Sequence, residues 1–194
     1  DLGAAGWLEP IRARDWRSCC LAREALAAAS PLADAVFALQ ALGTVPLLLA
    51  DAAPMRERWV EDAVRGRAMA AFAMTETEAG SDVSAIATTA TRDGQGYRLN
   101  GAKTFISNAG IADFYVVFAR TGDVPGAKGV SAFLVDADTP GLEITERIEV
   151  IAPHPLATLR FRDCRVGASA LIGRPGDGFK IAMATRDVFR TTVG

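Results

Sequence analysis

The stretch that decides the fold runs from Phe72 to Asn108 and reads FAMTETEAGSDVSAIATTATRDGQGYRLNGAKTFISN. Hydroxyl-bearing clusters stand at both of its ends, at positions 74–82 and 105–108. Between them lie the dipeptides Asp93-Gly94 and Asn100-Gly101, which are strong short-range signals for hairpin turns. The stretch therefore predicts β structure with tight turns between two clusters of polar side chains.

The sequence before residue 68 has a helical pattern. Asp15 is an N-cap for a first helix, and Ser30 followed by Pro31 marks the start of a second. Glycines that follow an apolar-periodic segment predict helix ends. We therefore expect three helices, spanning about 15–29, 31–43 and 53–66.

After residue 68 short apolar and β-branched runs alternate with turn signals, and from Gly178 the pattern becomes helical again. Closely spaced strands of this kind are typical of an antiparallel sandwich or barrel. The predicted fold is α+β and multidomain: partial N-terminal helices (1–67), an antiparallel β-barrel or sandwich domain (68–175) and the start of a helical bundle (176–194). The expected strands are Met69–Met74, Ser84–Thr91, Phe114–Ala119, Val130–Val135, Leu142–Ile148 and Leu159–Val166.

Composition excludes several classes of protein. Half of the 194 residues are hydrophobic and 23% are charged, so a packed core is expected rather than disorder. The net charge is −2 and no basic stripe is visible, which argues against a nucleic-acid partner. The longest apolar run, Val45–Ala50, is too short to cross a bilayer, so no transmembrane helix is expected. No recognisable signal peptide follows Asp1.

The cysteines and the single histidine predict neither disulfide bonds nor a metal site. Cys19, Cys20 and Cys164 give an odd count without a disulfide framework, so a reducing, cytoplasmic location is expected. His154 is the single histidine, and no paired Cys/His spacing predicts a metal site. His154 lies between two prolines, which we interpret as a rigid loop.

Taken alone, the polar clusters allow two interpretations. Thr75, Ser81 and Ser107 are short hydroxyls beside apolar strands, Gly80-Ser81 could turn backbone N–H groups toward a ligand, and Phe105 could stack on a flat ring. The same residue types are also common in turns and cores. No glycine-rich nucleotide motif or Walker loop is present.

The joint pattern is more specific and resembles the middle domain of the acyl-CoA dehydrogenase family. It consists of Thr-Glu-x-x-x-Gly-Ser-Asp from Thr75, Leu-Asn-Gly-x-Lys-x-Phe-Ile-Ser-Asn from Leu99 and Ala-Asp-Phe-Tyr-Val-Val from Ala112. The resemblance covers most of the chain. It continues through Leu39–Gly43, Gly129–Val135, Thr139–Leu142, Phe161–Val166 and Gly176–Met183.

The resemblance implies that the flavin of FAD lies against the β domain. Thr75 would hydrogen-bond the pyrimidine side of the ring, and Ser107 would lie at its N5 edge. Ser81 would also lie near the thioester arm, and Asp187 and Arg190 would contact the CoA part of the substrate, although an exposed helix pair is the ordinary alternative. The implied cofactor-binding residues are Phe72, Met74, Thr75, Gly80, Ser81, Phe105, Ile106 and Ser107.

The implied reaction removes the α-proton of an acyl-CoA with a general base and passes the β-hydride to flavin N5. Family members use a glutamate, either in a C-terminal helical domain or at the position of Phe189. We therefore expect no catalytic base in this chain, which reads as a fragment. An electron-accepting flavoprotein partner and a homo-oligomer, a dimer or tetramer, are also implied. An acyl-CoA oxidase or flavin monooxygenase, or a non-catalytic binding module, remains open.

Two departures from the family pattern stand out, and the second of them leaves the substrate open. Thr77 stands where the family usually has a proline after Thr-Glu. The segment Ile151–Ala157 replaces a Met-Gly-x-Arg-x-Ser/Thr stretch. Acyl length and branching therefore do not follow from the resemblance.

Overall fold

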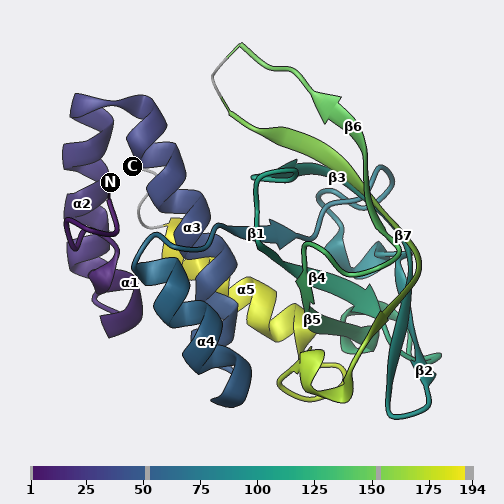
Figure 1. Ribbon diagram of the computed structural model, residues 1–194. Helices are drawn as coiled ribbons and strands as arrows, with labels where there is room; N and C mark the ends of the chain where they lie inside the picture. The colour runs from purple at the N-terminus through teal and green to yellow at the C-terminus, as the bar shows by residue number, and fades with distance from the viewer. Residues whose placement is uncertain (1, 51–52, 152–153, 191–194) are drawn as a thin grey trace.

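Helices gather on one side of the molecule and strands on the other in a computed structural model, which describes residues 2–50, 53–151 and 154–190. The C-terminal helix runs back from the strand side toward the N-terminal helices and so joins the helical layer (Figure 1). The helices are α1 (Glu9–Ala13), α2 (Trp16–Ala29), α3 (Pro31–Leu49), α4 (Ala53–Val64) and α5 (Gly178–Arg190).

The strands form one eight-stranded sheet in the order β6-β7-β3-β2-β4-β5-β8, with β1 paired to β4 beside this path. A hairpin of β6 and β7 projects beyond the rest of the sheet (Figure 1). The strands are β1 (Ala70–Ala73), β2 (Thr89–Asp93), β3 (Gly96–Ser107), β4 (Phe114–Arg120), β5 (Val130–Asp136), β6 (Leu142–Ile148), β7 (Leu156–Val166) and β8 (Leu171–Ile172).

This sheet corrects the predicted antiparallel barrel or sandwich. It is mixed, because β1 runs parallel to β4 with Ala70 opposite Phe114, and β2 is parallel to β4 at Thr89 and Arg120. It is also open, since β6 and β8 end the strand order without pairing to each other. Local turn signals predict hairpins, but they carry no information on pairing between strands some forty residues apart. The division at residues 67 and 175 stays a prediction.

Only one of the two predicted turns is a turn. Asp93-Gly94 connects β2 to β3, and Gly94 has a φ of 59°. Asn100-Gly101 lies inside β3, so that prediction is wrong. A Cβ on Gly101 would lie 2.7 Å from the Cα of Thr88, so glycine is needed there for close approach of two backbones.

The segment before β2 is also less regular than predicted. Val83–Ala85 is a 3-10 turn rather than the start of a strand. The Asp82 carboxylate accepts a hydrogen bond from the Ser84 backbone N–H at 3.0 Å, which favours a turn over an extended backbone.

The predicted helix starts are confirmed. Asp15 accepts from the Ser18 N–H at 3.1 Å and Ser30 accepts from the Ala33 N–H at 3.3 Å. The predicted end of the second helix at Gly43 is wrong, because α3 continues to Leu49. A Cβ on Gly43 would lie 2.5 Å from the Cβ of Ala70 on β1. This glycine therefore lets the helix approach the sheet and does not terminate it.

Helix α3 is the centre of the helical layer. The Gln40 side chain donates to the Ala63 and Ala68 carbonyls at 2.9 and 2.5 Å and accepts from the Ala70 N–H at 2.9 Å, which ties α3, α4 and β1 together. In the described chain α3 alone is long and apolar enough to cross a membrane by length and composition, and half of that stretch is buried against the rest of the molecule. Its packing is that of a core helix.

The central strand β4 is buried on both faces. Phe114, Val116 and Phe118 belong to the core between sheet and helices. Tyr115 and Val117 belong to a second core on the other face of the sheet. The sheet is therefore held against the helical layer along β4 and β1, and the ends of β1 and β3 meet that layer.

Candidate functional site

A cavity of about 230 Å³ opens where the ends of β1 and β3 meet α3 and α5. The two hydroxyl clusters of the sequence contribute opposite parts of its wall, one following β1 and the other ending β3. Seven of the eight residues predicted for the cofactor line it. The lining residues are Leu39, Leu42, Phe72, Met74, Thr75, Gly80, Phe105, Ile106, Ser107 and Arg186.

Three of the predicted site residues are not part of this wall. Ser81 follows the lining residue Gly80 but is itself exposed. Asp187 and Arg190 are exposed on α5 and do not line the cavity. Their predicted contacts with a substrate therefore stay predictions that concern the outer surface beside the cavity.

A β-bulge places Phe105 at the cavity. The β3–β7 register shifts between Lys103, which lies opposite Leu159, and Ile106, which lies opposite Ala157. The extra residue in β3 interrupts the regular register, and Phe105, which is 60% exposed, has a φ of 54°. Bulges and left-handed backbone at a bulky residue are concentrated at functional sites. An exposed aromatic face is thus held at the cavity rim.

The segment that follows β1 is fixed by a buried ion pair. Lys103 is fully buried, and its Nζ donates to Glu76 Oε1 at 2.7 Å and to the Met74 carbonyl at 3.0 Å. The Glu76 carboxylate also accepts from the backbone N–H groups of Ala87 and Thr88 at 2.7 and 3.0 Å. One cation from β3 and one carboxylate therefore hold the backbone on both sides of Thr75.

Both Lys103 and Glu76 have a pKa that differs from its ordinary value. Burial lowers the pKa of Lys103 to about 8, against the opposing effect of Glu76. Burial raises the pKa of Glu76, but the Lys103 charge and three hydrogen bonds outweigh it, so the pKa of this carboxyl lies below its ordinary value of 4.5. At neutral pH the pair is therefore ionised on both sides.

This shift predicts how acid affects stability. Because the folded-state pKa of Glu76 is lowered, the carboxylate stabilises the fold at pH values above 4.5, and that contribution disappears as the pH falls through the folded-state pKa. We expect Glu76→Gln to be less stable than the wild type above pH 4.5, with the gap narrowing below it. Urea unfolding of both proteins across this range measures the gap. A gap that stays constant with pH would contradict the shift.

Ser107 has a partner that the sequence did not predict. His154 Nε2 lies 2.8 Å from Ser107 Oγ, so the loop that we interpreted as merely rigid brings an imidazole to the cavity wall. The next residue, Asn108, has a φ of 63° and donates from Nδ2 to the Ala70 carbonyl at 2.9 Å. The end of β3 is thereby held against β1, and the imidazole of His154 fixes the Ser107 hydroxyl.

The helices add three residues that the sequence analysis did not assign to the site. Leu39 and Leu42 come from α3, and Arg186 comes from α5. Their helices lie far along the chain from the strand clusters and reach the cavity only through tertiary packing. Phe189, which the resemblance places opposite a substrate, is instead 5% exposed, and its ring meets Trp16 edge-on at 6.4 Å between centroids.

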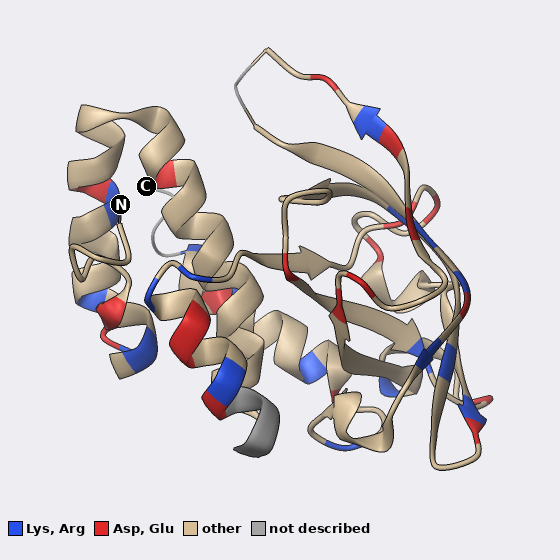
Figure 2. Ribbon diagram, in the orientation of Figure 1, with Lys and Arg blue, Asp and Glu red and all other residues tan. Residues whose placement is uncertain are grey.

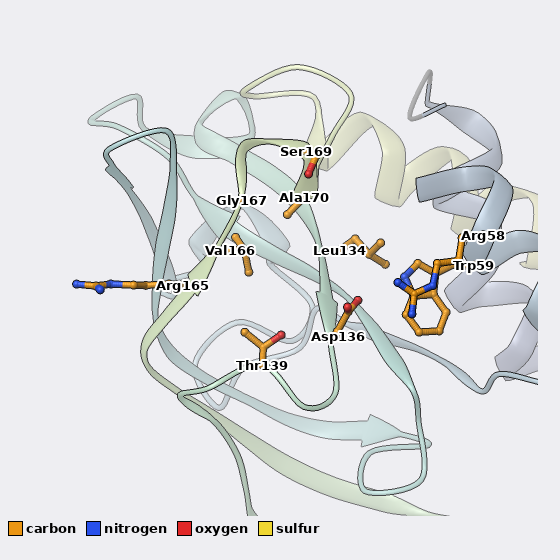
Figure 3. A pocket seen from close by; sticks show the side chains of 10 residues that line it. All are labelled: Arg58, Trp59, Leu134, Asp136, Thr139, Arg165, Val166, Gly167, Ser169 and Ala170. Carbon is orange, nitrogen blue, oxygen red and sulfur yellow. The ribbon is translucent and has the colours of Figure 1, made fainter. Parts of the chain in front are cut away.

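A second cavity, of about 390 Å³, lies between α4 and the sheet (Figure 3). Arg58 and Trp59 form its α4 side, facing Asp136 of β5, while the Arg165 side chain points away from it (Figure 3). Burial raises the pKa of Asp136, against the opposing effect of Arg58. None of the predicted site residues contributes to this cavity, so the cavity of about 230 Å³ is the candidate site.

Charged residues of both signs are interspersed over the helical layer and the sheet (Figure 2). Most ion pairs are short links on the surface, such as Arg67–Asp62 and Arg98–Asp93. Exposed pairs of this kind contribute little to stability. The Lys103–Glu76 pair beside the cavity differs from these, because both of its side chains are buried.

Comparisons with known proteins agree on one family. Residues 71–164 match the family described as acyl-CoA dehydrogenase, middle domain. The chain is 38% identical over 177 residues to a probable acyl-CoA dehydrogenase, FadE25, of Mycobacterium tuberculosis, which covers 90% of this chain and 46% of that protein. It therefore spans about half the length of the curated relatives it matches.

Solved structures are similar to this chain over nearly all of its length. Butyryl-CoA dehydrogenase from Megasphaera elsdenii superposes with a TM-score of 0.92 at 30% identity, over 99% of this chain and 54% of that chain. A structure described as the electron transferring flavoprotein of Acidaminococcus fermentans superposes with a TM-score of 0.93 at 32% identity, over 99% of this chain and 53% of that chain.

Proposed function

We propose that this chain, which belongs to the acyl-CoA dehydrogenase family, forms the flavin-binding side of an enzyme that introduces an α,β double bond into acyl-CoA thioesters. The observation that carries the proposal is the convergence of Thr75, Phe105 and Ser107 on one cavity with leucines from α3. A flat aromatic, two hydroxyls and apolar walls suit a ring stacked beside a hydrocarbon chain.

The residues present fit FAD as the cofactor. Phe105 offers an exposed aromatic face, and the Thr75 and Ser107 hydroxyls supply polar contacts at the cavity wall. Ligand pockets usually span about 300–1,000 Å³, so a cavity of about 230 Å³ suits only the reacting parts of the ligands, where the flavin ring would meet the acyl chain, rather than a whole dinucleotide. The remainder of the cofactor would lie along the surface beside it.

In the proposed reaction the Cα–H bond gives up a proton and the Cβ–H bond a hydride, and a carbon–carbon double bond forms between them. FAD, when bound, supplies the hydride acceptor. Phe105 would cover one face of the ring, and the Ser107 hydroxyl would donate a hydrogen bond at its edge. Such fixed donors stabilise developing negative charge without reorganising. Leu39 and Leu42 would exclude water from the acyl chain.

The proton acceptor is proposed to come from outside these walls. The ten described residues that line the cavity include no aspartate or glutamate. Glu76 is the nearest acidic residue in sequence, but its carboxylate is already engaged by Lys103 and two backbone N–H groups. We further propose an electron-accepting flavoprotein partner, a homo-oligomeric enzyme and a cytoplasmic location.

The test uses the protein expressed from its complete reading frame. Anaerobic titration with acyl-CoA thioesters should bleach the absorption of bound FAD, with a 2-enoyl-CoA as product. Absence of bleaching with any acyl-CoA, while FAD stays bound, would contradict the proposed reaction. Bleaching followed by rapid reoxidation in air would indicate an oxidase on the same fold instead.

Ser107→Ala should lower the reduction potential of bound FAD and slow its reduction by acyl-CoA. The variant removes a donor at the ring edge, which costs about 1 kcal/mol, or about fivefold in rate. Spectroelectrochemical titration and single-turnover reduction measure the two effects. Ser169→Ala, which removes an exposed hydroxyl in the other cavity, is the matched control. An unchanged potential and rate in Ser107→Ala would remove this hydroxyl from the site.

A further inference from the structure

Arg186 is the one charged group among the residues that line the candidate site. It is half-buried on α5. None of the hydrogen bonds and ion pairs found within residues 2–50, 53–151 and 154–190 includes its guanidinium. Other half-buried arginines of the chain are satisfied: Arg23 pairs with Asp34 at 2.7 Å, and Arg120 donates to four backbone carbonyls. Arg186 therefore stands out as a cation that faces a cavity and has no partner among the described residues.

The surroundings of Arg186 are apolar. Leu39, Leu42, Phe72 and Met74 line the same cavity, and its polar side chains are the neutral hydroxyls of Thr75 and Ser107. A charge placed among such groups is unfavourable unless an opposite charge joins it. The described walls supply no carboxylate, so an opposite charge carried by the ligand would offset this cost. A planar guanidinium binds carboxylates in a two-point geometry.

We propose that Arg186 selects acyl thioesters whose acyl chain carries a second carboxylate, so that the enzyme acts on the CoA thioester of a dicarboxylic acid. This rests on the proposed function. The leucines and Phe72 would contact the methylene chain, and the guanidinium would bind the distal carboxylate. Asp187 and Arg190 are exposed outside the cavity, so the surface of α5 offers other contacts for the charged CoA moiety.

The test compares two ligands of equal chain length on the FAD-loaded protein from the complete reading frame. Analogues of glutaryl-CoA and pentanoyl-CoA with sulfur in place of the β carbon lack a β hydride and therefore bind without reacting. Calorimetry gives their dissociation constants, so the readout is independent of turnover. The wild type should bind the dicarboxylate analogue at least about tenfold more tightly, since one charge-assisted contact is of that size.

Arg186→Leu should lose that preference, weakening the dicarboxylate analogue at least about tenfold while binding the pentanoyl analogue as well or better. Arg186→Lys keeps the charge and should retain part of the preference. Lys180→Leu removes an exposed cation two turns earlier on the same helix and should leave the ratio unchanged. Retention of FAD absorption checks that each variant is folded.

Several outcomes would overturn the proposal. One is a wild type that prefers the pentanoyl analogue, and another is an Arg186→Leu variant in which both analogues weaken equally. Pantetheine thioesters, which lack the nucleotide phosphates of CoA, provide a third arm: a loss in Arg186→Leu that disappears with them assigns the cation to a phosphate. Binding of neither acyl class by a protein that retains FAD would contradict the proposed function as well, which separates the two failures.

Discussion

Lys103→Met should lower the free energy of unfolding by about 3–5 kcal/mol, the usual cost of leaving one member of a buried ion pair without its partner. Lys103 is fully buried, and Glu76 is 8% exposed. Methionine fills most of the lysine volume, so the loss reports the uncompensated Glu76 charge and the lost donor to the Met74 carbonyl. Urea unfolding at neutral pH measures it.

Two further variants test the cause of this loss. Lys128→Met, on an exposed lysine, should change stability by less than about 0.5 kcal/mol. The double variant Lys103→Met with Glu76→Gln removes both charges and should recover part of the loss, because an amide oxygen can still accept from a backbone N–H. A single-variant loss below about 1 kcal/mol would mean that the pair is not desolvated as the structure has it.

Phe189→Glu should be the other severely destabilising change, with a loss of at least about 4 kcal/mol. Removing a buried aromatic ring costs about 3–5 kcal/mol, and a carboxylate in its place lacks a partner beside Trp16. Phe189→Leu keeps the site apolar and should cost only about 1–2 kcal/mol. Thermal and urea unfolding distinguish them. Equal stability of the two variants would place the ring outside the helical core.

The packing of Phe189 determines whether a catalytic carboxylate could act from this position of α5. The resemblance aligns Phe189 with a position that holds the base in some family members, yet here the ring packs against the N-terminal helices. The residue of α5 that lines the cavity is Arg186. A glutamate introduced at 189 would therefore face the helical core rather than a substrate.

Local interactions made much of the fold predictable. Asp15 and Ser30 are capped as expected, because capping depends on backbone groups three residues away. Asp93-Gly94 forms its turn as expected, because a turn also depends on residues adjacent in sequence and Gly94 readily adopts its φ of 59°. The predictions for Gly43 and Asn100-Gly101 are wrong because these glycines allow close packing against Ala70 and Thr88, which are distant in sequence. A glycine needed for a tertiary contact has no local signature that separates it from a turn glycine.

The residues of the candidate site also fall into two groups, those that local sequence predicts and those that it does not. The residues that follow β1 and end β3 could be identified because each belongs to a contiguous motif. Leu39, Arg186 and His154 could not, since each enters from a separate element through tertiary packing. The Pro-His-Pro sequence predicts a rigid loop, but the contact of His154 with Ser107 joins residues that are far apart in the sequence.

Binding of FAD by the wild type and by Phe105→Ala tests the central claim, that the bulge of β3 presents a face of the flavin site. Phe105 is 60% exposed with a left-handed backbone, so its ring contributes little to the core and is free to stack on a ligand. Val124→Ala, at an apolar side chain that is 50% exposed, is the matched control. Quenching of FAD fluorescence should show about fivefold weaker binding in Phe105→Ala and no change in Val124→Ala, as expected for the loss of one aromatic stacking contact. Equal FAD affinity in the wild type and Phe105→Ala would contradict the assignment of this cavity to the flavin.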